Sequence, residues 1–194
     1  MRDSRTVQEI HRAREFEAFV AGAGGRLLHT ATLLTAESPA DNPRARRLLT
    51  LALARTYACW DRLRGEDPYD RAREQLATRF AHYAWHAYVR RLYDALPLDR
   101  VLPPGGLPAL RRDVVPEPRR RRPAAAGPLA LLAPQERLVL VLRLYEGVAE
   151  EQAAALLGLP VDRVRTLCDR ATTTLLRPPR ARTTVTPRAK AAAS

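Results

Sequence analysis

The sequence predicts an all-α protein in which a linker rich in proline and arginine joins two small helical domains. Apolar residues recur at helical spacing in two separate stretches, 15–96 and 129–177. Residues 97–128 between them hold eight prolines, three glycines and a run of four arginines. Such a composition cannot form a packed core, so we expect a flexible basic linker there. The C-terminal stretch ends in the pattern of a helix-turn-helix.

Helices are expected throughout the N-terminal domain, residues 15–96. From Phe16 onward, apolar residues recur at spacings of three and four. A turn cluster at 36–43 precedes a helix that Asn42 and Pro43 open and that ends near Trp60. A second break, "RGEDPYD", leads into a further helical stretch that continues to residue 96.

Three shorter helices are expected in the C-terminal domain, residues 129–177. Pro134 suits the first position of a helix, and Gly147 is a suitable stop. A short helix over 149–157 ends at Gly158, and the segment "GLP" turns the chain into a helix over 161–176. The tail, 178–194, is expected to be disordered.

The charge of the chain favours polyanionic partners. Its formal net charge is +12, and 32 of its 33 basic residues are arginine. A GC-rich genome would explain the replacement of lysine by arginine, but not the surplus of basic residues over 21 acidic ones. Such a surplus favours nucleic acid first and an anionic membrane second.

Several classes of site are not expected. Cys59 and Cys168 are too few and too far apart for a disulfide framework or a zinc site. His82 and His86 lie one helical turn apart, but no third metal ligand is evident. The sequence has no P-loop, nucleophile elbow or paired-carboxylate cleft, so we expect neither an enzyme nor a cofactor. Without a signal peptide or an apolar run of about 18 residues, we expect a cytoplasmic protein with no membrane partner.

The last helix presents a candidate DNA-reading face. Its inward stripe is predicted to consist of Val161, Val164, Cys168, Ala171 and Leu175. The outward face then holds arginine and threonine, which can reach base edges and phosphates in the major groove. The candidate DNA contacts are Arg163, Arg165, Thr166, Asp169 and Arg170. The alternative is the solvated face of a three-helix bundle, since Asp162 and Asp169 weaken the positive charge.

The C-terminal stretch resembles the fourth conserved region of ECF-type bacterial sigma factors, especially the SigE-like actinobacterial group. The residues in register with the family pattern are Leu132, Pro134, Arg137, Val139, Leu142, Arg143, Tyr145, Glu146, Ala154, Leu157, Gly158, Val164 and Arg170. The N-terminal half resembles the second region of the family more loosely, through residues 16–36 and 52–63. Taken over the N-terminal half and the C-terminal unit together, the resemblance covers about two-thirds of the chain.

The resemblance implies that the chain binds the RNA polymerase core. It also implies that the second helix of the helix-turn-helix reads the minus-35 promoter element, and that the N-terminal domain melts the minus-10 element. Aromatic rings among arginines suit unstacked bases, so the candidate single-strand contacts are Tyr69, Arg79, Tyr83 and Trp85. A buried aromatic core is the alternative. An anti-sigma factor or other regulator is a further expected partner.

The chain departs from the family pattern at three places, one of which is the start of the last helix, where Asp162 and Arg163 replace a glycine and a threonine. Family members carry an acidic stretch that binds the polymerase clamp, whereas residues 45–53 read "ARRLLTLAL", and Arg46, Arg47 and Thr50 are the candidate polymerase contacts. Pro160 replaces the capping serine of the recognition helix. The chain is identified as a divergent ECF-type sigma factor. A degenerate sigma-like adaptor and a stand-alone helix-turn-helix regulator are the alternatives.

Overall fold

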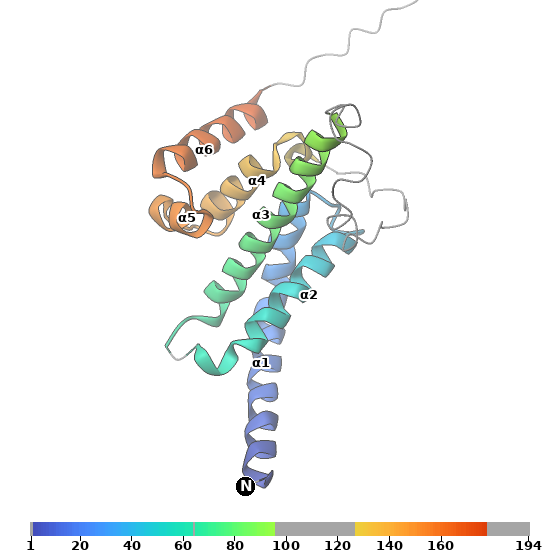
Figure 1. Cartoon of the computed structure of the whole chain (residues 1–194), viewed down its shortest axis with the longest axis vertical. Coiled ribbons are helices and arrows are strands. Elements are labelled where there is room, and N and C mark those ends of the chain that lie inside the picture. Colours follow the sequence, from blue (N-terminus) through green and yellow to red (C-terminus); the bar gives the residue numbers. More distant parts are fainter. Residues whose placement is uncertain (1, 64, 96–126, 178–194) are drawn as a thin grey trace, which may run out of the picture.

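The computed structural model describes residues 2–63, 65–95 and 127–177 (Figure 1). Within those ranges the elements are helices, with no strand, so the predicted all-α class is confirmed. Almost all of the predicted linker, 97–128, and the whole predicted tail, 178–194, lie outside the described residues.

Three long helices form the N-terminal unit. Helix α1 spans Arg2–Thr35, α2 spans Pro43–Ala58 and α3 spans Pro68–Ala95, with the short 3-10 helix η1, Trp60–Arg62, after α2. Their shared core consists of Leu27, Ala31, Ala45, Ala52, Ala72 and Leu76. The first turns of α1 extend beyond α2 and α3 (Figure 1). The charged N-terminal residues thus continue the same helix that carries the apolar pattern from Phe16 onward.

Helix α2 begins where the sequence predicts, but Glu37 caps it rather than Asn42. The buried Glu37 carboxylate accepts hydrogen bonds from the backbone N–H groups of Arg44, at 3.2 Å, and Ala45, at 2.8 Å. The Asn42 side chain makes no capping bond and donates instead to Thr32 Oγ1, at 3.2 Å. A carboxylate can satisfy two free N–H groups of a helix start and also interact favourably with the helix dipole.

The C-terminal unit consists of short helices. The 3-10 helix η4, Pro128–Leu131, precedes α4, Pro134–Leu140, which continues as a π-helical turn, η5, Val141–Tyr145. Helices α5, Glu150–Leu157, and α6, Val161–Leu176, follow. Gly147 and Gly158 have φ angles of 69° and 64° after η5 and α5. Glycine adopts this left-handed backbone without strain, so the predicted helix ends at both glycines are confirmed.

The two units pack against each other through a common core. Leu34 of α1 and Ala77 and Phe80 of α3 belong to one buried cluster with residues of the C-terminal unit. Those residues are Leu138, Val139, Val141, Leu142, Val148, Ala153, Ala154, Val164 and Leu167. Figure 1 shows α4 beside α3, with α5 and α6 on the outer side. The boundaries of separate domains at 15–96 and 129–177 stay a prediction.

Candidate nucleic-acid interface

Helices α5 and α6 form a helix-turn-helix. At the end of α5, the N–H of Leu159 donates to the Ala154 carbonyl, at 3.0 Å, and closes the turn at Gly158. Pro160 then occupies the N-cap position of α6, where no side chain caps the helix. The carbonyl of Pro160 accepts from the N–H groups of Arg163 and Val164. The helix therefore starts without the side-chain acceptor that serine would supply.

The buried side of α6 differs by one residue from the predicted stripe. Val164, Leu167 and Ala171 are buried, whereas Val161, Cys168 and Leu175 are half-buried at the edge. The predicted stripe omitted Leu167, although its spacing of three from Val164 and four from Ala171 fits a helix face. Burial raises the pKa of the Cys168 thiol, so this cysteine is a packing residue with reduced thiolate character.

The opposite side of α6 is exposed along its whole length. All five candidate DNA contacts lie on it, together with two further polar residues: Asp162, Arg163, Arg165, Thr166, Asp169, Arg170 and Thr173. Among the described residues, no carboxylate lies within ion-pair distance of Arg163 or Arg170. These two guanidinium groups are seven residues apart, so they lie near the same face about 10 Å apart along the axis. They can therefore contact a polyanion together.

Arg165, in contrast, is engaged within the protein. One terminal nitrogen of its guanidinium donates to Glu150 of α5 at 3.1 Å, and the other donates to Asp162 at 3.1 Å. Glu150 also lies 3.6 Å from Arg143. To bind DNA, Arg165 has to break or weaken its hydrogen bonds to these two carboxylates. This cost lowers the net binding free energy from a phosphate or base contact.

A shallow groove runs between α6 and the start of α4. Its lining residues are Glu136, Thr166, Asp169, Arg170, Thr173 and Thr174. The hydroxyls of Thr166 and Thr173 donate to the carbonyls of Asp162 and Asp169, each at 2.8 Å. In this rotamer both hydroxyl oxygens remain available as acceptors. The groove thus combines several acceptors with one arginine, which suits the amino groups of base edges more than phosphate.

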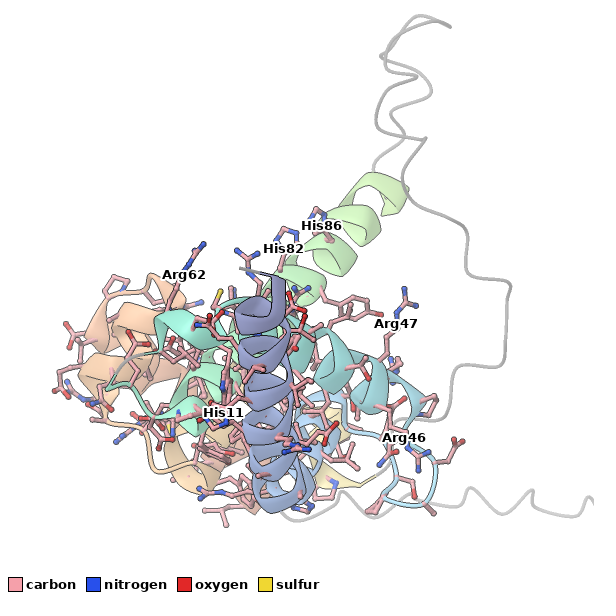
Figure 2. The ribbon with its side chains drawn as sticks, turned by 90° about the horizontal axis from the view of Figure 1, so that it is seen from below. His11, Arg46, Arg47, Arg62, His82 and His86 are labelled. Carbon is pink, nitrogen blue, oxygen red and sulfur yellow. The ribbon has the colours of Figure 1, made fainter. Side chains whose placement is uncertain are left out.

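The three candidate polymerase contacts lie on the exposed side of one helix. Arg46, Arg47 and Thr50 are all exposed on α2, and Figure 2 shows Arg46 and Arg47 on the outer side of this helix. The Nε of Arg46 donates to Asn42 Oδ1 at 2.9 Å, which holds its stem against the start of the helix. The structure thus brings these residues together on a surface that a partner can reach.

The four candidate single-strand contacts do not form one platform. Tyr69 lies in the first turn of α3, and Tyr83, which is 57% exposed, lies about 20 Å further along the same helix. Arg79 is half-buried, and its Nε has no hydrogen-bond partner within the described part of the chain. Trp85 lies on α3, but its side chain is outside the described residues. Stacking by Tyr83 and Trp85 stays a prediction.

Tyr69 has a different, unexpected environment. Its hydroxyl donates to the Glu146 carboxylate, at 2.9 Å to Oε2 and 3.0 Å to Oε1, and the Arg26 guanidinium lies 4.7 Å from its ring centre. The Thr30 hydroxyl also donates to Glu146, and Arg26 lies 3.3 Å from it. Sequence reasoning aligned Glu146 with the family pattern but missed this contact, because its partners lie on α1 and α3.

Two further sequence observations can be placed in the structure. His82 and His86 lie side by side on α3 (Figure 2), with their Nε2 atoms 2.9 Å apart. Among the described residues, no group of three or more metal-ligating side chains includes them. Within the same part of the chain, no helix is both long and apolar enough to span a bilayer.

Comparisons with known proteins place the chain in a family. Residues 129–175 match the family model described as Sigma-70, region 4. The RNA polymerase sigma-E factor of Streptomyces coelicolor is 31% identical over 157 residues, which cover 81% of this chain and 81% of that protein. Sigma-E factors of Streptomyces avermitilis and Streptomyces antibioticus are 31% and 30% identical over 157 residues, 81% of this chain and 80% of theirs. The chain therefore belongs to the ECF-type RNA polymerase sigma factors, as a divergent relative of the sigma-E group.

Proposed function

We propose that this chain acts as a sigma factor that binds the RNA polymerase core and recognises promoter DNA through its C-terminal helix-turn-helix. The observation that carries the proposal is the exposed polar face of α6, within a stretch that matches sigma region 4. Arg163 and Arg170 supply charge without a nearby carboxylate in the described structure, and Thr166 and Asp169 supply acceptors for base edges. As a sigma factor, the chain would direct the polymerase in the cytoplasm rather than catalyse a reaction itself.

The DNA-reading role of α6 can be tested with duplex promoter DNA and the full chain bound to core polymerase. Arg163→Ala with Arg170→Ala should weaken binding at least about tenfold and lower its salt dependence, because each guanidinium contacts a base or phosphate. Arg14→Ala with Arg62→Ala is the matched control, since it removes the same charge from exposed positions on the N-terminal unit that are not candidate contacts. An equal loss of affinity in both variants would mean that α6 contributes only through the overall charge of the chain and does not read the promoter.

A sigma-like adaptor is the second candidate function, and one observation favours it. Arg165 is bound by Glu150 and Asp162, so a central arginine of the reading face is neutralised within the protein. Competition with the principal sigma factor for the host's core polymerase distinguishes the two functions when transcription is measured alongside. A sigma factor displaces its competitor and starts transcripts, whereas an adaptor binds without initiation.

The stand-alone regulator receives less support. The sigma-E relatives match over 157 residues, which reach well beyond the C-terminal unit. An unrelated N-terminal domain would not extend the match in this way. We further propose that a regulator such as an anti-sigma factor binds the C-terminal unit, because Leu131, Leu144 and Leu176 are exposed there and offer apolar contacts.

A further inference from the structure

Two histidines on α3 form a pair that the proposed function does not use. His82 and His86 are both exposed, and their Nε2 atoms lie 2.9 Å apart (Figure 2). Their rings stand almost at right angles, with an interplanar angle of 80° and ring centres 4.3 Å apart. Among the described residues, neither ring has a second hydrogen-bond or ion-pair partner. The pair therefore presents two imidazole nitrogens to solvent from a single helical turn.

The helix holds the two nitrogens close together. Residues four apart in an α-helix lie on the same face, with about 5–6 Å between their Cβ atoms. Helix α3 spans Pro68–Ala95, so both histidines lie well inside it. A neutral imidazole can carry its proton on Nδ1, which leaves the Nε2 lone pair free to bind a metal ion. Because both rings are exposed, they can turn toward a common point outside the helix without loss of core packing.

The distance between the two nitrogens indicates which ions the pair suits. Histidine nitrogens bind metal ions such as Zn²⁺ at about 2.0–2.1 Å. Two bonds of that length to atoms 2.9 Å apart enclose an angle of about 90° at the ion. A tetrahedral ion would need the nitrogens about 3.3–3.4 Å apart instead. An angle near 90° belongs to neighbouring positions of square-planar or tetragonal coordination, which Cu(II) and Ni(II) favour.

We propose that His82 and His86 bind one transition-metal ion of tetragonal preference, Cu(II) or Ni(II), through their Nε2 atoms. Water can complete the coordination, so the site needs no third protein ligand. The expectation of no metal here rested on the lack of such a ligand, which a structural zinc site requires. Two ligands on one helix bind more tightly than one, because the second bond forms within the molecule at a high effective concentration. The site is independent of the proposed function, since neither histidine is a candidate DNA or polymerase contact.

The chain has two other histidines, His11 and His29, and one of them belongs to a competing pair. His11 Nε2 lies 3.0 Å from a carboxylate oxygen of Glu15 at the same helical spacing. That pair offers one nitrogen and one oxygen, and Glu15 also accepts from the Trp60 ring N–H, at 3.4 Å. Imidazole suits copper and nickel, whereas carboxylate suits magnesium, calcium and manganese. We therefore expect the first ion to bind at the two histidines of α3.

The site can be tested with Cu(II) and the full chain carrying Cys59→Ala and Cys168→Ala, because thiolates also bind copper. Calorimetric titration should show one Cu(II) per chain in the tightest step, and pulsed electron paramagnetic resonance should show two bound imidazoles. His82→Gln and His86→Gln, made singly, should each weaken binding at least about tenfold, because each leaves one imidazole. The matched control, His11→Gln with His29→Gln, removes two imidazoles elsewhere and should change neither the affinity nor the number of bound imidazoles.

Three results would overturn the site. The first is a control variant that loses as much affinity as the variants at His82 and His86. The second is a resonance spectrum with fewer than two bound imidazoles. The third is one ion per two chains, because the ion would then join two copies. Circular dichroism checks that every variant keeps its helices, so that a loss of binding is not mistaken for unfolding.

A second titration tests the coordination geometry and its dependence on the folded helix. Ni(II) should bind several-fold more tightly than Zn(II), because the nitrogens are spaced for a right angle. Tighter binding of Zn(II) would overturn the tetragonal assignment. Saturating Ni(II) should also slow amide hydrogen exchange between His82 and His86, since the ion binds only when the helix brings both rings together. Unchanged exchange there would mean that the ion binds elsewhere on the chain.

Discussion

Arg165 of the recognition helix is bound by Glu150, which lies on the preceding helix of the helix-turn-helix. Their 3.1 Å contact joins two exposed or half-exposed side chains, and Asp162 binds the other end of the same guanidinium. An exposed pair of this kind adds about 0–1 kcal/mol to folding stability. We expect a larger effect on DNA binding, because the two carboxylates occupy the donors of a proposed DNA contact.

The first prediction follows from this pair. Glu150→Gln should bind promoter DNA about two- to fivefold more tightly than the unaltered chain, because Arg165 loses one of its two charged partners. Fluorescence anisotropy with labelled duplex, at two or more salt concentrations, measures the effect. The gain should shrink as the salt concentration rises, since salt screens exposed charges.

Glu151→Gln supplies the control for this experiment. Glu151 is the neighbouring residue on α5, it is exposed, and its substitution changes the net charge by the same amount. It makes no ion pair with Arg165. If Glu151→Gln strengthens binding as much as Glu150→Gln does, the effect comes from overall charge and not from the release of Arg165.

The second prediction concerns alkaline pH. Burial, and then the hydrogen bond to Glu146, raise the pKa of Tyr69 above its usual 10.0, while the guanidinium of Arg26 opposes the rise. A raised pKa in the folded state means that the neutral phenol is favoured there. Its contribution to stability is therefore complete below about pH 10 and declines as the pH rises further. A phenolate next to the Glu146 carboxylate would be strongly unfavourable.

Tyr69→Phe removes this titration. The unaltered chain should be about 1–3 kcal/mol more stable than Tyr69→Phe at about pH 8, because the hydroxyl donates to a charged acceptor. This difference should shrink as the pH approaches about 11. Urea unfolding of both chains across this range measures it, and other titrating groups cancel in the comparison. A difference that stays constant would show that the Tyr69 hydroxyl does not titrate with folding.

The fold was largely predictable because its signals are local. Helical spacing of apolar residues located the helices, and glycines at 147 and 158 marked two helix ends, each with a positive φ angle. The π-helical turn was not predictable, because its i to i+5 bonds, such as Glu146 N–H to the Val141 carbonyl, have no sequence signal here. Glu37 was missed as a cap because it lies seven residues before Arg44, across a turn.

The candidate site was predictable only in part, because only some of its features have local signals in the sequence. The exposed face of α6 follows from its own periodicity, and the structure places every residue of that face outward. The partners of these residues depend on tertiary packing. Glu150 reaches Arg165 because α5 packs on α6, and Tyr69 reaches Glu146 across 77 residues of sequence. Residue spacing within one helix contains no information on such contacts.

The third prediction tests the unexpected cap of α2. Glu37→Gln should lower the free energy of unfolding by about 2–4 kcal/mol, because its amide offers one acceptor oxygen and turns N–H donors toward the backbone N–H groups of Arg44 and Ala45. Urea unfolding at neutral pH measures the loss. Glu17→Gln, at an exposed position of α1, is the control and should change stability by less than about 0.5 kcal/mol. Equal stability of the two variants would contradict the capping role.

The fourth prediction concerns Arg137, whose guanidinium donates to three backbone carbonyls. Nε reaches Leu129 at 2.9 Å, and the terminal nitrogens reach Leu34 at 3.0 Å and Leu132 at 3.1 Å. Burial lowers the pKa of Arg137, yet three carbonyl dipoles, one at the C-terminal end of α1, favour its positive charge. A lysine ammonium is a single point, and it cannot reach three carbonyls that the planar guanidinium spans.

Arg137→Lys should therefore destabilise the protein by about 2–4 kcal/mol, because at least one buried carbonyl loses its donor. The control is Arg163→Lys, which makes the same substitution at an exposed position of α6. It should leave the free energy of unfolding nearly unchanged. Hydrogen exchange separates the local effect from the global one, because loss of the bond to the Leu34 carbonyl should increase opening at the end of α1 and the start of α4 together. Faster exchange at the start of α4 alone would mean that Arg137 stabilises its own unit and does not join the two.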